Sequence, residues 1–401
     1  MTRTIQEILG DDVIRRLRMP IAEAGGLPGV AYTSQEFFDL ERERLFPRVW
    51  TGIGFTSDVP EPGDAIPLVI AGVPLILCRD GEGEIRVFHN VCRHRAAIML
   101  EKPEKGLKQF SCPYHAWAYS LNGDLKGIPY FDGTPSSREC GLDWSKNGLV
   151  PVRVGVWHHW IFVNLDGKAP PLEEYIAPLI KLTDGFDIGA TRFHTRLDWE
   201  FDANWKFQND NWETYHHIWV HEQVFRRMSD DIEIETRRPW MEPLNWENVA
   251  TLWHREGSKR LNVHESNGLP WIPFTKDVKE RRGGTSIIFP NVTMTLTPDH
   301  IASVITDPVA PDKTRAILGF FFVGDAATAP EFEDLRKPAL DRWLGKSRDR
   351  YGNDGIRSQD FRIWEGQQIA RKSTVADDVK FSPVWEQNIH YFQNRLVDAL
   401  M

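Results

Sequence analysis

Two pairs of cysteine and histidine most strongly constrain what this chain can fold into. Cys92 and His94 form the first pair, and Cys112 and His115 form the second pair 17 residues later. Each pair brings a thiol and an imidazole within a few residues of each other, and the flanking turn signals place both pairs on hairpin tips. The pattern therefore predicts a metal group held between two loops of a small β module.

The mixed pairing of the ligands indicates which metal group this is. Two cysteines on one iron and two histidines on the other are the ligands of a Rieske [2Fe–2S] centre. Zinc also takes two cysteines and two histidines, but structural zinc sites space them as C-x2–4-C and H-x3–5-H. Half of the chain's 4 cysteines fall in the pattern, which argues against coincidence. Cys78 and Cys140 have no histidine at ligand spacing and are expected to be ordinary buried thiols.

The first part of the chain divides into a helical segment and a β-rich segment. Residues 1–48 are predicted to be helical, and Thr33 with Glu36 has the spacing of a capping box. Residues 49–168 contain short β-branched and aromatic runs, separated by Asn-Gly and Asp-Gly turn signals. Residues 168–178 carry three prolines and are expected to be a linker.

The remainder of the chain separates its helices from its strands. A long helix is predicted from residue 201 to about 228, strands from about 285 to 324, and helices from about 330 onward. Strands and helices in separate blocks indicate an α+β fold rather than a doubly wound parallel sheet. No G-x-G-x-x-G motif or P-loop occurs, so the chain is not expected to bind NAD or ATP.

Length and charge exclude several functions. A chain of 401 residues predicts two or three domains. The net charge of −9 argues against binding nucleic acid or an anionic membrane surface. The longest apolar stretch, Ala65 to Cys78, is interrupted by proline and glycine and is too short to cross a bilayer. With no visible secretory signal, a cytoplasmic protein is expected.

A second set of candidate metal ligands lies in the predicted helix after residue 201. Glu213 and His216 are three residues apart and share a helix face. His216 and His221 are five apart, about 140° out of phase on a regular helix, so they share a metal only if the helix breaks or His221 leaves it. The alternative is a surface helix whose core stripe is Trp205, Trp212 and Trp219.

Together these motifs resemble the α (oxygenase) subunits of the Rieske non-heme iron aromatic-ring-hydroxylating oxygenases. The family has an acid-x2-His-x4-His pattern after an NWK element, and here residues 204–206 precede Glu213-x2-His216-x4-His221. The resemblance covers almost the whole chain. It implies a helical segment (1–48) that packs with the catalytic domain, an all-β Rieske domain (49–168), and a helix-grip catalytic domain (169–401) of antiparallel sheet and helices.

The resemblance also implies the ligands of both metal groups. The [2Fe–2S] cluster is expected on Cys92, His94, Cys112 and His115. One mononuclear Fe(II) is expected on His216, His221 and a carboxylate, a triad that leaves positions open for oxygen. The family takes this carboxylate from a C-terminal helix, which indicates Asp360, with Glu365 as the second choice on the same predicted helix.

Four further residues follow from the resemblance. Glu213 is expected to bridge a Rieske histidine, His115, to an iron histidine, His216, of the neighbouring subunit; many relatives carry aspartate there. Ala96 replaces the usual glycine and is expected to have an ordinary φ. His217 neighbours the expected ligand His216, but its side chain is expected to point about 100° away. It is therefore expected to pack against other residues or to support a ligand, rather than to bind the metal. Asn211 lies where some relatives have a residue near the iron.

The implied activity is hydroxylation, by mono- or dioxygenation, with O₂. A separate NAD(P)H-dependent flavin/[2Fe–2S] reductase or a ferredoxin would supply electrons. Similar proteins form head-to-tail homotrimers, which a closed heterologous ring allows, and no separate β subunit is expected. A different class of function, a Rieske electron carrier without mononuclear iron, stays as an alternative.

The sequence narrows the substrate less. Residues 199–271 hold eight of the 16 tryptophans. They indicate either core packing or an aromatic-lined pocket between about Trp240 and Met294. Such a pocket suits an aromatic or other apolar cyclic substrate, which is favoured, or a carnitine- or betaine-like quaternary ammonium. A carboxylate in the pocket, other than Asp360 and Glu213, would favour the cation.

Overall fold

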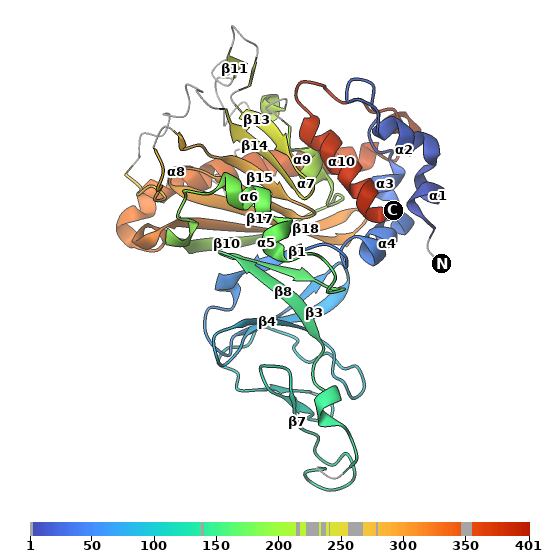
Figure 1. Ribbon diagram of the computed structural model, residues 1–401, viewed down its shortest axis with the longest axis vertical. Helices are drawn as coiled ribbons and strands as arrows, with labels where there is room; N and C mark the ends of the chain where they lie inside the picture. The colour runs from blue at the N-terminus through green and yellow to red at the C-terminus, as the bar shows by residue number, and fades with distance from the viewer. Residues whose placement is uncertain are drawn as a thin grey trace. The chain divides into compact units, whose positions relative to one another are not determined.

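The computed structural model contains two compact units, Met1–Leu45 with Glu173–Met401, and Phe46–Leu172. Residues 3–137, 140–213, 217–221, 232–233, 238–239, 241–255, 268–277, 280–345 and 355–401 are described. Figure 1 shows antiparallel sheets accompanied by helices, so the predicted α+β class is confirmed. Among the described helices, none has the length and apolar character needed to cross a bilayer.

The unit Phe46–Leu172 is built on two antiparallel sheets. The larger has six strands in the order β1 (Thr51–Phe55), β9 (Trp160–Asn164), β8 (Pro151–Trp157), β4 (Ile85–His89), β3 (Val73–Arg79) and β2 (Ala65–Ile70). The smaller contains β5 (Phe110–Ser111), β6 (Ala118–Tyr119) and β7 (Leu125–Gly127). The turn joining β2 to β3 has φ of 49° at Ala71 and 84° at Gly72, as a type I′ hairpin requires.

The predicted Asn-Gly and Asp-Gly turns are present in this unit. Gly123, between β6 and β7, has φ of 91°, which glycine adopts without strain. Asp80, between β3 and β4, accepts hydrogen bonds from the amides of Glu82 and Glu84, both at 2.9 Å. These local bonds fix the hairpins and therefore the positions of the loops that follow them.

The other unit is organised around a seven-stranded antiparallel sheet. Its order is β10 (Thr191–Phe201), β18 (Lys313–Val323), β17 (His300–Ala310), β16 (Val292–Leu296), β15 (Gly284–Ile288), β14 (Val249–His254) and β13 (Met241–Asn245). The central strands β17 and β18 are buried along most of their length, on both faces. The strands predicted between about 285 and 324 are confirmed. A two-stranded pair, β11 (Ile232–Glu233) and β12 (Arg238–Pro239), completes the strands.

Helices accompany this sheet. They are α1 (Ile5–Leu9), α2 (Asp11–Leu17), α3 (Val30–Thr33), α4 (Gln35–Arg44), α5 (Leu172–Tyr175), α6 (Ala177–Leu182), α7 (Phe207–Asp210), α8 (Glu333–Leu344), α9 (Ile356–Ala370) and α10 (Gln387–Leu400). The C-terminal helix α10 contacts α2, α4, β13 and β14 (Figure 1). Nε2 of His390 lies 2.7 Å from the Leu17 carbonyl, which ties α10 to α2.

Three local predictions differ from the structure. Ser34 rather than Thr33 caps α4, accepting a hydrogen bond from the Phe37 amide at 3.3 Å. The expected linker contains the short helix α5 and the start of α6. In the described part of residues 201–228, the expected long helix is replaced by α7, which ends at Asp210, and a 3₁₀ turn at Ile218–His221. Asparagine and aspartate end α7 because their side chains bond elsewhere: Asp210 accepts from Gln393 at 3.1 Å.

Candidate metal centres

Two loops of the Phe46–Leu172 unit have the same backbone bonding. The amide of Cys92 donates to the carbonyl of Ala97 at 2.8 Å, and the amide of Cys112 donates to the carbonyl of Trp117 at 2.8 Å. The second loop joins β5 to β6, as the hairpin prediction required. Each loop therefore presents its cysteine and its histidine on a closed, rigid turn.

The backbone of these loops corrects one prediction. Ala96 has φ of 57° and Ala116, at the equivalent place in the second loop, has φ of 55°. Both lie in the left-handed region, where a Cβ atom costs about 1–2 kcal/mol. The expectation of an ordinary φ at Ala96 is wrong, because closing the loop back onto Cys92 requires this turn. The glycine of many relatives would adopt it without strain.

The four predicted cluster ligands come together in these loops. The thiols of Cys92 and Cys112 are buried, and the ring centroids of His94 and His115 lie 4.6 Å apart. The Nδ1 atoms of both histidines are buried and have no hydrogen-bond partner in the described part of the chain. Buried polar atoms are rarely left unpaired. Two buried thiols and two imidazole nitrogens without a partner in the described part of the chain are a donor set that fits a [2Fe–2S] group.

Neighbouring side chains support this site. The His94 ring stacks on Trp117 with centroids 4.9 Å apart. The hydroxyl of Tyr119 lies 3.4 Å from the sulfur of Cys92 and accepts from the amide of Arg93 at 3.1 Å. Sequence reasoning did not single out Tyr119, which only its closeness to the second pair could have suggested. Of the remaining cysteines, Cys78 is buried as expected and Cys140 is partly buried.

A second cluster of potential ligands lies in the other unit. One ligand atom each from His217, His221 and Asp360 falls within 4.8 Å of the other two. Nε2 of His221 is 3.2 Å from Oδ1 of Asp360, and Nε2 of His217 is 3.8 Å from the same oxygen. Asp360 projects from α9 and is 3% exposed. Two imidazoles and one carboxylate match the facial triad that binds non-heme Fe(II).

Both histidines are oriented in the way metal-binding imidazoles usually are. Nδ1 of His221 lies 2.8 Å from Oε1 of Gln359, and Nδ1 of His217 lies 2.7 Å from Oε1 of Glu213. An oxygen acceptor at Nδ1 fixes the proton there and places the lone pair on Nε2, the atom with which a metal would bond. Gln359 was not identified from the sequence, although its place beside Asp360 on the predicted helix could have suggested it.

Electrostatics hold the carboxylate in its ionised form. Burial alone would raise the pKa of Asp360, but the hydrogen bond and charge of His221, with smaller contributions from His217 and Arg357, hold it below the usual value. Burial likewise acts to lower the pKa of His221, and its bonds to Asp360 and Gln359 outweigh that effect and raise it. An anionic oxygen is what a divalent cation requires.

The predicted triad and the observed cluster share two members. His221 and Asp360 lie together, whereas His216 lies outside the described residues. His217 was expected to point away but lies in the cluster. The expectation assumed 100° of helical rotation per residue, and His217 lies in a turn before the 3₁₀ segment. The described geometry therefore makes His217 a candidate iron ligand, alongside the motif residue His216.

The remaining candidates are also placed. Nδ2 of Asn211 lies 3.1 Å from Oδ1 of Asp360 and 3.3 Å from Nε2 of His217, so its amide borders the cluster. Glu365, the second choice for the carboxylate, accepts a hydrogen bond from the amide of Asp202 at 3.1 Å and is not in the cluster. The cluster therefore draws its carboxylate from Asp360.

The NWK element anchors the segment that precedes the cluster. Lys206 and Glu41 are fully buried and paired, with Nζ 2.7 Å from Oε1, and Trp205 donates to the other carboxylate oxygen at 3.0 Å. Burial raises the pKa of Glu41 and lowers that of Lys206. Nδ2 of Asn204 donates to the carbonyl of Pro311 at 2.7 Å. These bonds fix α7 against α4 and the sheet.

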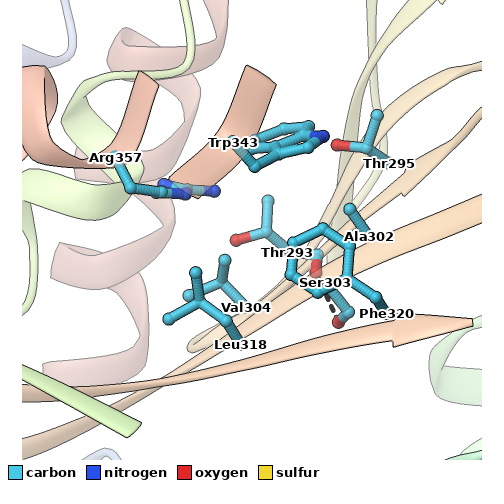
Figure 2. A pocket seen from close by; sticks show the side chains of 9 residues that line it. All are labelled: Thr293, Thr295, Ala302, Ser303, Val304, Leu318, Phe320, Trp343 and Arg357. Carbon is cyan, nitrogen blue, oxygen red and sulfur yellow. Dashed lines mark hydrogen bonds between the residues drawn. The ribbon is translucent and has the colours of Figure 1, made fainter. Parts of the chain in front are cut away.

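A small cavity lies between the sheet and the helices α8 and α9 (Figure 2). It is lined by Thr293, Thr295, Ala302, Ser303, Val304, Leu318, Phe320, Trp343 and Arg357. Its volume of about 10 Å³ admits one water-sized group. Its aromatic rings come from β18 and α8, not from the stretch between Trp240 and Met294, where Trp253 and Met294 are buried in the core. Trp240 lies outside the described residues.

The fold and the two clusters together define a class of protein with a Rieske module and a mononuclear-iron module. The family of ring hydroxylating alpha subunits, through its catalytic domain, matches residues 188–401. The Rieske [2Fe–2S] domain matches residues 49–138. The chain therefore belongs to the Rieske oxygenase α-subunit family, whose members carry a [2Fe–2S] cluster and a mononuclear iron.

Curated relatives fall into two groups. The biphenyl dioxygenase subunit alpha of Metapseudomonas furukawaii is 31% identical over 203 residues, covering 48% of this chain and 44% of the relative. The glycine betaine monooxygenase oxygenase subunit of Pseudomonas aeruginosa is 29% identical over 203 residues, covering 50% and 46%. The matched region thus spans less than half of the length of these relatives.

Solved structures share the fold over nearly the full chain. Naphthalene 1,2-dioxygenase from Rhodococcus sp. bound to indole superposes with a TM-score of 0.76 and 21% identity, covering 98% of this chain and 99% of that one. A quaternary ammonium Rieske monooxygenase, described with carnitine oxidation and inter-subunit electron transfer, gives 0.73 and 21%, covering 97% and 98%.

Proposed function

We propose that this chain is the oxygenase component of a multi-component enzyme. It hydroxylates an aromatic or other apolar cyclic small molecule, using O₂ and electrons from a separate NAD(P)H-dependent reductase or a ferredoxin. The observation that carries the proposal is the cluster of His217, His221 and Asp360, whose ligand atoms lie within 4.8 Å of one another. A triad of this kind leaves coordination positions open for oxygen and substrate.

Each module has its own part in the proposed reaction. Cys92, His94, Cys112 and His115 would hold the cluster that receives electrons one at a time. Asp360, His221 and one histidine of the adjacent pair 216–217 would hold the iron, which supplies the capacity to bind and reduce O₂. The acceptors Gln359 and Glu213 orient the imidazoles, so the site is preorganised before any ligand binds.

A head-to-tail homotrimer is part of this proposal. The structure of one similar protein is described in terms of inter-subunit electron transfer. Glu213 is suited to bridge the two centres, because its Oε1 already lies 2.7 Å from Nδ1 of His217 in the proposed mononuclear iron site. The same carboxylate would accept a hydrogen bond from a partner subunit's Rieske histidine, for which the prediction is His115.

Two alternatives are weaker. Oxidation or N-demethylation of a quaternary ammonium is suggested by the glycine betaine monooxygenase relative. None of the nine described residues that line the cavity carries a carboxylate to balance such a cation. A Rieske electron carrier needs no second metal site, whereas the described part of the catalytic unit contains an oriented triad.

A single-turnover experiment tests the proposal. The protein is loaded with both metals, reduced chemically without a reductase, and mixed with ¹⁸O₂ and an aromatic compound such as biphenyl or benzoate. The proposal predicts a hydroxylated product that contains ¹⁸O. An Asp360→Ala variant is the control, and it should keep the reduced cluster but form no product. Cluster oxidation without oxygen insertion, for every ring compound tried, would support the electron carrier instead.

A further inference from the structure

A buried arginine, Arg357, lies beside the proposed mononuclear iron site formed by His217, His221 and Asp360. Arg357 lies on α9, one turn before Asp360, and is 2% exposed. Its Nη1 donates to Oε1 of Gln208 at 2.9 Å and lies 4.0 Å from Oδ2 of Asp360. A guanidinium keeps its charge in proteins, so Arg357 is a buried cation. Burying a cation is costly unless its donors are paired.

The guanidinium is incompletely paired, and it lines the cavity. Nε of Arg357 is buried and has no hydrogen-bond partner among the described residues. The Oγ1 atom of Thr293, which lines the same cavity, is also buried and unpartnered in the described part. Figure 2 shows Arg357 reaching from α9 into the cavity beneath Trp343, toward the sheet residues that include Thr293. Two hydrogen-bond donors without a partner in the described part, one from α9 and one from β16, therefore border the same cavity.

A buried arginine of this unit that has a purely structural role is bonded differently. Arg336 is 5% exposed, and its Nη1 donates to the carbonyls of Ala326 at 2.7 Å and Ala329 at 3.1 Å. Those backbone oxygens account for its burial. At Arg357 the corresponding acceptor is missing among the described residues on the side that faces the cavity. The donor set there matches an oxygen acceptor that comes from a ligand.

The chemistry of the cavity selects the kind of acceptor. A guanidinium presents planar donors that match the two oxygens of a carboxylate, and a threonine hydroxyl can add one bond. The remaining walls, including Val304, Leu318 and Phe320, are apolar. The cavity volume of about 10 Å³ admits one water-sized atom, such as one oxygen of a carboxylate, and not a whole ring. It would therefore hold a substituent while the rest of the molecule extends beyond it.

We infer that Arg357, with Thr293, binds a carboxylate substituent of the substrate, so that the substrate is an aromatic or alicyclic carboxylic acid. The inference rests on the proposed function and narrows its substrate class. Because Arg357 lies one turn before Asp360, the carboxylate of the bound substrate would lie to one side of the proposed iron site. A quaternary ammonium group would meet a like charge at this position, whereas the carboxylate of a carnitine- or betaine-like molecule would not.

The test compares matched acids and amides as ligands of the iron-loaded holoenzyme. Benzoate, phenylacetate and 1-naphthoate are each titrated beside their neutral amides by calorimetry, which needs no turnover. Wild type should bind the best acid about tenfold or more tighter than its amide, because a charge-assisted pair is formed. Arg357→Gln should weaken the acid about tenfold or more and change the amide less than about twofold. Arg357→Lys should recover part of the loss, since it keeps the charge but not the planar fork.

Two controls separate this inference from a structural effect. Arg336→Gln removes a buried guanidinium away from the cavity and should leave the ratio of acid to amide affinity unchanged. Thr293→Val should lower that ratio even if Arg357→Gln does not fold. Iron content and ¹⁸O incorporation, measured on the same samples, report on the proposed function separately. A wild type that binds no acid better than its amide, or a ratio unaffected by both variants, would overturn the inference.

Discussion

His217 and His221 show how single hydrogen bonds prepare a metal site. Each ring directs Nδ1 to an amide or carboxylate oxygen and Nε2 toward the same oxygen of Asp360. Because neutral imidazole has one proton, the oxygen at Nδ1 decides which nitrogen remains a ligand. Preorganisation at this scale depends on Glu213 and Gln359 as much as on the ligands themselves.

Iron content of two single variants tests which of the adjacent histidines is the ligand. The motif spacing indicates His216, and the geometry places His217 beside Asp360. A facial triad takes two histidines, and His221 is the proposed first one. We therefore predict that one of His216→Ala and His217→Ala loses most of its mononuclear iron while the other keeps it. Retention of full iron by both variants would show that neither histidine is a ligand.

Ala96, which has a strained backbone in the loop that carries Cys92 and His94, gives a stability prediction. Ala96→Gly should raise the free energy of unfolding by about 0.5–1 kcal/mol, because glycine adopts φ near 57° without strain. Ala97 is the matched control, since it is partly buried and its φ is not positive. Ala97→Gly should cost about 0.5–1 kcal/mol. Thermal unfolding of the two variants checks this, and destabilisation by Ala96→Gly would contradict the account.

Site residues could be predicted where residue type and local spacing determine the chemistry. They could not be predicted where the tertiary fold determines which side chains meet. The four predicted [2Fe–2S] ligands follow from residue type and spacing, and Asp360 follows from the resemblance to the family. The inclusion of His217 does not, because it depends on where a helix ends. Arg357 and Gln359 are ordinary polar residues in sequence, and only the packing of α9 beside the sheet gives them neighbours. The positive φ of Ala96 likewise comes from loop closure.

Among the elements, the segment Asn204–Asp210 joins the sheet to the metal cluster. Lys206 and Glu41 form a buried pair, and the ammonium also lies 5.2 Å from the ring centroid of Phe37. The pair stabilises α7 against α4 only while both charges are present. A lone buried charge has a desolvation cost with no compensating partner.

Removing one charge of this pair should therefore destabilise the catalytic unit strongly. Lys206→Met is expected to lower the free energy of unfolding by about 3–5 kcal/mol. Lys313→Met is the control, because its pair with Glu200 at 2.9 Å is exposed and worth less than about 1 kcal/mol. Urea denaturation measures both. A similar small loss in the two variants would mean that the buried pair does not anchor α7.

Helices and strands could be predicted from the sequence to the extent that a regular pattern of apolar residues marks them. The strands β15 to β18 are largely buried, and their β-branched runs identify them. The edge strand β10 is mostly half-buried and carries alternating charges, so no apolar run marks it. The helix expected after residue 201 failed because tertiary bonds of Asp210 and Asn211 override the apolar periodicity.

At the scale of the whole molecule, the account requires electrons to cross between subunits. We predict that Glu213→Gln keeps the cluster and the iron yet loses most product formation. The amide would still orient an imidazole but would no longer be the anionic bridge. Glu365→Gln is the control, since that carboxylate bonds the backbone of Asp202. Full activity of Glu213→Gln would remove the bridge from the mechanism, and loss of iron would make Glu213 part of the iron site.

The central claim is that one chain carries both metal centres. Anaerobic iron and sulfide analysis, combined with EPR of the dithionite-reduced protein, tests it most directly. The account predicts about three irons and about two sulfides per chain with a Rieske-type signal. Two irons with that signal, unchanged after Fe(II) is added, would contradict the mononuclear site. Zinc without an EPR signal would contradict the account as a whole.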